Sequence, residues 1–328
     1  MTTHAEIPVH ADFTRAPGLL EGATTYELSP QECDIEFWLT AVAQGSLRGL
    51  VRGRRPESEV PGFLRAPGPL RDNLIIEFAF RSLTEIEATR ICALATAAAP
   101  NPQYMDFFAT QTLDEARHAD SFRSHLLDLG VPAGELHETV ERVARQDVRR
   151  LIDPMWQWGN GVLERDAATR FIDIVAVITV ILEGVLAPTT ELSELKWKGI
   201  SQATADIERG ACVDEIRHLS VGSWIIRKHV ADNPLDTQRL VDFVAEGRRN
   251  WAALPTAEII YAREQLFQEG ILRHADAIGD YQIFPGRRLV DSTPEERMLR
   301  ALEWSEEVQR SRLSYMGLGA AMPAQASL

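Results

Sequence analysis

The hydrophobic and polar positions of this chain repeat with the period of an α-helix over most of its length. Apolar residues recur three and four positions apart in four long segments, and the first three of these end at Pro or Gly residues that stop a helix. The segments span residues 72–98, 104–129, 165–188 and 201–230, and shorter ones lie at 137–150, 237–249, 255–273 and 293–312. Strand-like alternation between turn residues is scarce, so the pattern predicts an all-α protein.

Composition divides the chain into three regions. Residues 1–71 are rich in Pro, Gly and polar residues and predict an N-terminal arm with one short helix within 33–47. Residues 72–230 hold the four long helices and have the size of a four-helix bundle core. Residues 231–328 predict peripheral helices followed by a tail.

The charge of the chain bears on its partners and its compartment. The 328 residues carry a formal net charge of −14 without a basic stripe, which argues against nucleic acids and anionic membranes as partners. No run of about 18 apolar residues is present, and the polar start lacks the features of a signal peptide. We expect a cytoplasmic protein that acts on a small molecule.

A five-residue motif occurs twice, once in the second long helix and once in the fourth. It reads DEARH at residues 114–118 and DEIRH at residues 214–218. Residues three apart share a helical face, so Glu115 projects with His118 and Glu215 with His218. In each turn a carboxylate and an imidazole can reach one metal ion. A surface salt-bridge cluster would need no such repetition.

A pair of metal ions requires further carboxylates, which the other two long helices offer. Glu183 lies alone in the apolar run AVITVILEGVLA, where an unpaired carboxylate would cost several kcal/mol. In the first helix Glu87 shares its face with apolar residues, whereas Glu85 shares its face with polar ones. The pattern favours Glu87 as the ligand and leaves Glu85 as the alternative. This is the di-metal carboxylate plan of helical bundles.

The aspartate and the arginine of each motif have a supporting role in this interpretation. Asp114 and Asp214 are each expected to accept the free N–H of the opposite histidine, with Arg117 and Arg217 neutralising the aspartates. The three cysteines form no Cys-x-x-Cys pair, which excludes an iron–sulfur site, and the ligand set is expected to contain no thiolate. Oxygen-rich ligands then suit iron or manganese.

The motifs resemble those of the ferritin-like di-iron oxygenases, most closely the hydroxylase subunits of bacterial multicomponent monooxygenases. The resemblance covers about residues 72–230 and implies a four-helix core with two irons that react with dioxygen. Three positions depart from known groups: Ala187 replaces a Thr of the monooxygenases, Phe122 replaces the radical Tyr of ribonucleotide reductase, and Ala211 replaces the extra His of arylamine N-oxygenases.

The resemblance implies an enzyme that oxidises a small nitrogen-containing metabolite, with the azoxy-forming oxygenases of the valanimycin type as the nearest group. No flavin or iron–sulfur motif is present, so a separate reductase is expected to supply electrons. Hydroxylation or desaturation of a C–H compound at the same metals is an alternative, as is a non-catalytic iron-binding protein. A homodimer is the default expectation for such proteins.

Overall fold

Helices make up nearly all regular structure in the computed structural model, which describes residues 7–43, 47 and 49–322. The prediction of an all-α protein is confirmed, and the only strands among these residues form a hairpin of β1 (Gln282–Phe284) and β2 (Arg287–Arg288). The α-helices are α1 (Leu19–Thr25), α2 (Ile35–Phe37), α4 (Pro69–Ala98), α5 (Pro102–Asp128), α6 (Leu136–Leu163), α7 (Ala167–Ala176), α8 (Glu183–Lys198), α9 (Gln202–Asp232), α10 (Thr237–Ala252), α11 (Thr256–Arg273), α12 (Ala275–Ile278) and α13 (Pro294–Met316). Short 3-10 helices lie at Val9–Ala11, Gly62–Leu64, Ala133–Glu135, Pro234–Asp236, Leu289–Asp291 and Gly319–Ala321.

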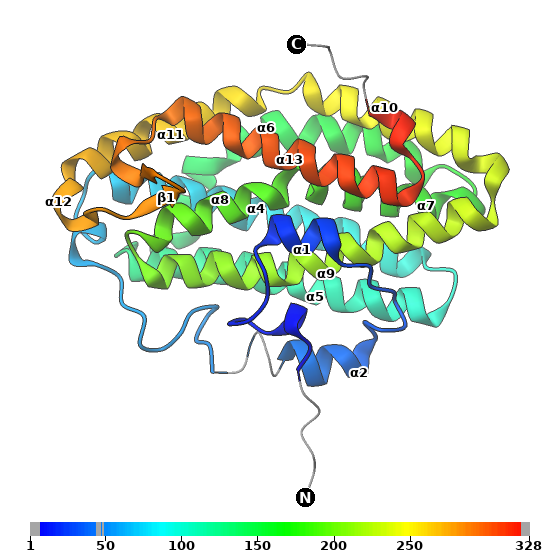
Figure 1. Cartoon of the computed structure of the whole chain (residues 1–328), viewed down its shortest axis with the longest axis horizontal. Helices are drawn as coiled ribbons and strands as arrows, with labels where there is room; N and C mark the ends of the chain where they lie inside the picture. Colours follow the sequence, from blue (N-terminus) through cyan, green and yellow to red (C-terminus); the bar gives the residue numbers. More distant parts are fainter. Residues whose placement is uncertain (1–6, 44–46, 48, 323–328) are drawn as a thin grey trace, which may run out of the picture.

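Short connections make consecutive long helices antiparallel neighbours. The side chain of Asn101 accepts a hydrogen bond from the backbone N–H of Tyr104 and caps α5 directly after α4 ends. Ser201 caps α9 in the same way through the N–H of Thr204. As a result α4 packs along α5, and α8 packs along α9 (Figure 1).

The third long segment differs from its prediction, because the helix does not stop at Pro188. It continues through this residue to Lys198, and the hydroxyl of Ser305 on α13 donates to the carbonyl of Val185 one turn earlier. Burial on all sides holds the helix together where proline removes one backbone donor. Directly before Glu183 the backbone widens into a π-helix, η5 (Val177–Leu182), a feature that is frequent at functional sites.

Helix α6 is also longer than predicted. The expected helix at 137–150 runs on to Leu163 and includes Pro154. Its strong segregation of apolar and polar residues lets one face pack against α4 along its length.

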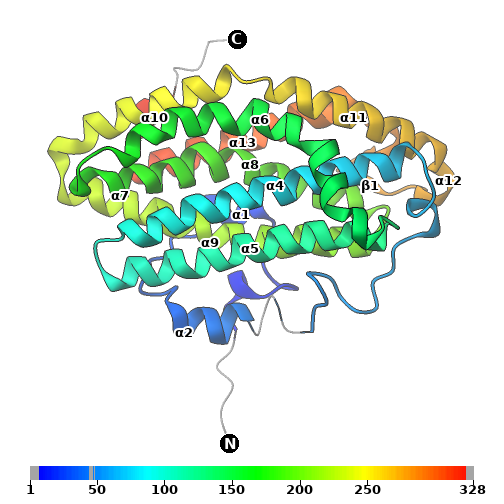
Figure 2. The same cartoon turned by 180° about the vertical axis from the view of Figure 1, so that it is seen from behind.

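The C-terminal helices and the N-terminal arm surround the long helices. Helix α11 packs on α4, α13 packs on α8 and α9, and α10 packs on η5. Figures 1 and 2 show α10 and α11 above the long helices as drawn, with α1 across α9 and α2 below α5. A second π-helix, η2 (Trp38–Val42), follows α2 in this arm.

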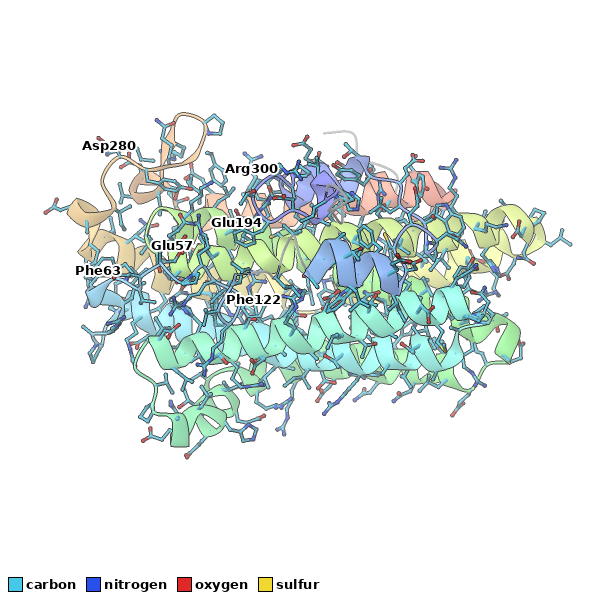
Figure 3. All side chains as sticks on the ribbon, turned by 90° about the horizontal axis from the view of Figure 1, so that it is seen from below. Glu57, Phe63, Phe122, Glu194, Asp280 and Arg300 are labelled. Atoms are coloured by element: carbon cyan, nitrogen blue, oxygen red, sulfur yellow. The ribbon has the colours of Figure 1, made fainter. Side chains whose placement is uncertain are left out.

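Aromatic side chains fill the interior between the long helices. Phe122 on α5 is buried and meets Phe78 of α4 edge-on, with ring centroids 5.1 Å apart. Figure 3 shows Phe122 among the packed helices, whereas Asp280 lies at the periphery. The stretch Thr169–Lys198 has the length and hydropathy of a membrane span, but 89% of its most apolar window is buried within the protein, as in a core helix.

The contact between α11 and α4 gives a test of the packing. A Cβ atom at Gly270 would lie 2.7 Å from the backbone nitrogen of Leu70, so Gly270→Ala must push the two helices apart. We expect this variant to lose about 1–3 kcal/mol of unfolding free energy, measured by urea denaturation. At Gly210 in α9 the nearest atom is 3.9 Å away, so Gly210→Ala should be neutral or stabilising by up to about 1 kcal/mol. Equal stability of the two variants would contradict the packing described here.

Candidate metal centre

The two repeated turns face each other across the interface of α5 and α9. One carboxylate oxygen of Glu115 lies 3.3 Å from Nδ1 of His118, and the other lies 3.2 Å from Nδ1 of His218. Glu115 therefore stands between the two imidazoles. This is the position of a carboxylate that can bridge two ions.

Three more carboxylates complete the group. Glu215 lies 3.8 Å from Nδ1 of His218, and Glu85 lies 4.0 Å from Nδ1 of His118. Glu183 reaches the same place from α8 and has an oxygen within 4.8 Å of one from Glu115. We call these six residues the carboxylate–histidine cluster: Glu85, Glu115, His118, Glu183, Glu215 and His218.

The choice of Glu87 over Glu85 in the first long helix does not agree with the structure. Glu87 points away from the cluster and accepts hydrogen bonds from Arg90 at 2.7 Å and from the indole N–H of Trp156 at 3.1 Å. The two side chains are similarly buried, with 13% of Glu87 and 17% of Glu85 exposed, so burial could not distinguish them. The direction in which α4 presents each carboxylate decides the matter.

The polar atoms of the cluster lack hydrogen-bond partners inside the protein. Both carboxylate oxygens of Glu115 are buried without a hydrogen bond, and so are one oxygen each of Glu183 and Glu215. The Nδ1 atoms of His118 and His218 are in the same state. Buried polar groups are nearly always satisfied, and six unsatisfied atoms that converge on one place are what a cation would bind. The residues therefore fit one or two metal ions.

The electrostatics of the cluster also favour a cation. Burial raises the pKa of Glu85 and of Glu183 well above the usual range, and the neighbouring Glu115 and Glu215 raise both pKa values further. Burial opposes the charged form of His118, but its contacts with the carboxylates of Asp214 and Glu115 outweigh it and raise the pKa of His118 to about 10. Without a metal ion, protons take the place of the missing positive charge.

The aspartates of the repeated turns hold the far side of each imidazole. Nε2 of His118 lies 3.1 Å from Asp214, and Nε2 of His218 lies 3.4 Å from Asp114. This is the crossed pairing expected from the sequence. It leaves each Nδ1 free to face the centre of the cluster.

The two arginines tie the aspartates together. Arg217 donates to Asp114 on the other helix and, at 3.1 Å, to Asp214 on its own helix. Arg117 donates to Asp214 and, at 3.3 Å, to Asp114. Burial raises the pKa of Asp214, but the two arginines outweigh it and hold that pKa well below its usual range. Asp214 therefore remains an acceptor for His118.

Three residues join this site that the sequence did not assign to it. The indole N–H of Trp38 donates to both oxygens of Asp114 at 3.1 Å, and no local pattern in the arm predicted this. Gln111 on α5 donates to Glu183 at 2.5 Å. Cys92 places its sulfur within 4.8 Å of one oxygen of Glu115 and one of Glu183, although the sequence offered no thiolate for the ligand set. The signal for Cys92 was its spacing of seven residues from Glu85, which puts both on one face of α4.

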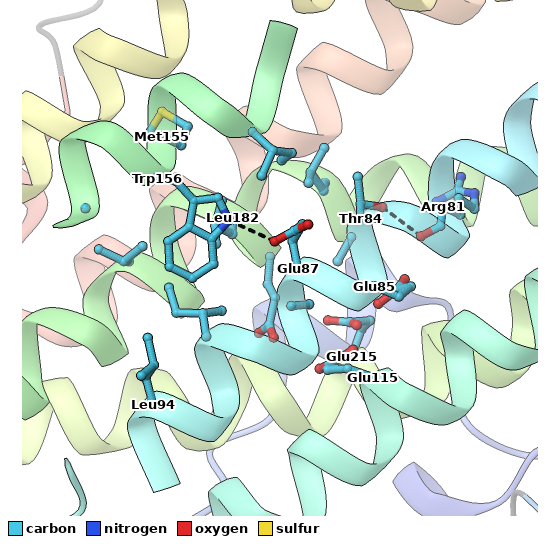
Figure 4. A pocket seen from close by; sticks show the side chains of 18 of the residues that line it. Arg81, Thr84, Glu85, Glu87, Leu94, Glu115, Met155, Trp156, Leu182 and Glu215 are labelled. Carbon is cyan, nitrogen blue, oxygen red and sulfur yellow. Dashed lines mark hydrogen bonds between the residues drawn. The ribbon is translucent and has the colours of Figure 1, made fainter. Parts of the chain in front are cut away.

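A cavity that is partly open to solvent adjoins the cluster. Glu85, Glu115 and Glu215 form one side of it, and Glu87 with Trp156 forms another (Figure 4), while Glu183 also lines the cavity. The rest is mainly apolar and comes from α4, α6, α7, η5 and α8: Phe80, Ile91, Leu94, Ile152, Met155, Val162, Ile174, Val177, Leu182 and Leu186. The cavity can hold a largely apolar molecule beside the cluster.

A buried polar group lies next to this cavity on the side of Arg81. Arg81 donates to Thr190 at 2.7 Å and lies 3.1 Å from Glu208. The hydroxyl of Ser193 lies 2.5 Å from Glu208 and 2.6 Å from Glu77. Burial raises the pKa of Glu208 to about 7 despite the opposing charge of Arg81. This carboxyl therefore titrates near neutral pH.

Comparison with protein-family models finds no match for this chain, and comparison with curated protein sequences finds none either. The interpretation of the site therefore depends on the residues themselves and on their arrangement.

The assignment of Glu85 in place of Glu87 as the α4 carboxylate of the cluster can be tested with one substitution at each residue. Glu85→Gln should lower the affinity for one of two metal ions by more than the roughly 10- to 100-fold that loss of an outer partner costs. Glu87→Gln keeps an acceptor for Trp156 and should leave the metal content unchanged. Isothermal titration with Fe²⁺ or Co²⁺ without air, checked by elemental analysis, measures both. If Glu87→Gln lowered the metal affinity and Glu85→Gln left it unchanged, the assignment of Glu87 made from the sequence would be correct.

The titration of Glu208 gives a second test. A folded-state pKa of about 7 against a usual value of 4.5 means that its contribution to stability is complete below pH 4.5 and is lost as the pH rises through 7. The loss corresponds to about 3 kcal/mol at 1.36 kcal/mol per pKa unit. The test is urea unfolding at fixed metal content. From pH 5 to pH 8.5, the difference in unfolding free energy between Glu208→Gln and the wild type should shift in favour of the variant by up to about 3 kcal/mol. Glu307→Gln, at an exposed position, is the control. A constant difference across this pH range would contradict the raised pKa.

Proposed function

We propose that this protein is a non-haem di-iron oxygenase of the ferritin-like type, in which α4, α5, α8 and α9 are the four-helix core. The observation that carries the proposal is the convergence of six unpartnered buried atoms beside an apolar cavity. Glu85, Glu115 and His118 would hold one ion, and Glu183, Glu215 and His218 would hold the other with Glu115 between them. The bound irons would supply the electrons that activate dioxygen.

The residues around the ions have distinct tasks in this proposal. Asp114 and Asp214 orient the histidines by accepting hydrogen bonds from their Nε2 atoms, and Arg117 and Arg217 pair with these aspartates. The apolar wall of the cavity binds the substrate and excludes water from the cluster. A separate reductase would return the electrons after each turnover, because the sequence contains no flavin or iron–sulfur motif of its own.

The substrate of this proposal is a small nitrogen-containing metabolite, oxidised at nitrogen and in the nearest case taken from a hydrazine to an azoxy compound. The mainly apolar lining of the cavity favours a second candidate, hydroxylation or desaturation at carbon, because such substrates offer few polar groups. A mainly apolar cavity next to the cluster supports an enzyme over an iron-storage protein. The proposal places the protein in the cytoplasm, with a homodimer as its expected state.

Isotope labelling in a single turnover tests the function. Protein loaded with two Fe²⁺ without air is mixed with hydrazines, hydroxylamines or aliphatic compounds and then with ¹⁸O₂, and the products are weighed. In a single hydroxylation, at nitrogen or at carbon, one oxygen atom of O2 enters the product and the other leaves as water, with two electrons from the two Fe²⁺ ions and two protons. The azoxy compound requires a further two-electron oxidation of the N-hydroxy product, with loss of two hydrogens. We expect ¹⁸O on nitrogen. Label on carbon, or a product lacking two hydrogens, would favour the second candidate.

A variant that lacks the central carboxylate is the control for this experiment. Glu115→Ala removes the carboxylate between the two histidines and should abolish both iron binding and product. Wild-type protein that binds two irons but consumes no dioxygen with any of these compounds would contradict the oxygenase proposal.

A further inference from the structure

The structure brings a thiol into the carboxylate–histidine cluster. The sulfur of Cys92, one oxygen of Glu115 and one oxygen of Glu183 lie within 4.8 Å of one another, and all three side chains are buried. Cys92 belongs to α4, whereas the two carboxylates come from α5 and α8. Three helices thus contribute one potential ligand atom each to a single point.

These distances are those of atoms that can share an ion. A metal ion bound about 2.3 Å from sulfur and about 2.1 Å from oxygen separates the two atoms by at most about 4.4 Å. The observed limit of 4.8 Å exceeds this maximum by about 0.4 Å, so binding of a shared ion requires the side chains to move closer together. Independent evidence comes from the carboxylates, because one oxygen of Glu183 and both oxygens of Glu115 are buried without any hydrogen-bond partner.

The other two cysteines have different surroundings. Cys212 on α9 lies only three residues before Glu215 but packs among Leu19, Ala187 and Val308, away from the cluster. Cys33 is buried in the N-terminal arm. Among the groups of potential metal ligands in the described part of the chain, Cys92 is the only cysteine.

We propose that Cys92 is a metal ligand, so that the ion held by Glu183 is bound by a thiolate together with carboxylates and an imidazole. This inference rests on the proposed metal centre and adds a sulfur donor to it. Binding replaces the S–H bond of Cys92 by a metal–sulfur bond, and the proton passes to solvent. No electron is transferred in this step.

The sulfur donor changes which metal the site prefers. Carboxylate and water ligands suit manganese, whereas a soft thiolate favours iron, cobalt or zinc in the divalent state. The oxygen and nitrogen ligands alone leave iron and manganese open. Cys92 selects the iron-like ions at one of the two positions.

Cobalt is a direct probe, because thiolate ligation of Co²⁺ produces a charge-transfer absorption band in the near ultraviolet. Metal-free protein is titrated with Co²⁺ without air in the wild type, in Cys92→Ser and in Cys212→Ser. We expect the band in the wild type and in Cys212→Ser and its loss in Cys92→Ser. Circular dichroism verifies that each variant is folded.

The visible bands of cobalt separate this inference from the proposed metal centre. Visible bands without the charge-transfer band in the wild type, or a charge-transfer band that persists in Cys92→Ser, would overturn the role of Cys92 and leave the centre intact. Absence of both kinds of band would overturn the centre and the ligand together.

A second measurement does not depend on spectroscopy. The ratio of Co²⁺ to Mn²⁺ affinity, measured by competition, should fall by at least about tenfold in Cys92→Ser, as is typical when a metal site loses a supporting group. An unchanged ratio would show that Cys92 only fills space beside the metals.

Discussion

Four carboxylates in the apolar interior are the constraint on which the rest of the structure depends. Glu85, Glu115, Glu183 and Glu215 cannot all be ionised there without a compensating positive charge, because desolvation and mutual repulsion oppose it. Protons can supply that charge, but they leave buried oxygens without hydrogen bonds. Metal ions satisfy both the charge and the coordination. The site and the fold are therefore coupled through one requirement.

The crossed network around the histidines makes this centre rigid. Each aspartate is held by an arginine from its own helix and by one from the opposite helix, and it accepts from the opposite histidine. Helices α5 and α9 are thus locked in register by charge pairs that are fully buried or nearly so. Such pairs add little net stability, but removing one partner leaves an unpaired charge in the interior. The network therefore preserves the position of the ligands more than it raises the stability of the fold.

The peripheral helices complete the site that the long helices begin. Helix α6 supplies Ile152, Met155, Trp156 and Val162 to the wall of the cavity, so a region outside the repeated motifs shapes the space beside the cluster. The N-terminal arm reaches the centre from the other side through Trp38, whose indole donates to Asp114. A π-helix directly precedes Glu183. The cavity and the cluster are therefore built by segments from much of the described chain.

The sequence by itself determined the long helices and the two repeated turns, because these follow from spacing within one helix and from a near-identical repeat. The crossed contacts of their aspartates and histidines join α5 to α9 and were shown by the structure. The long helix of residues 167–198 was cut short at Pro188 in the prediction, since local propensity says nothing of the burial that carries a helix past a proline. Glu85 and Glu87 are equally acidic and similarly buried, and only the rotation of α4 against α5 decides which of them faces His118. The same rotation brings Cys92 to the carboxylates. Contacts between helices depend on packing angles that no single helix encodes, and the structure alone reveals them.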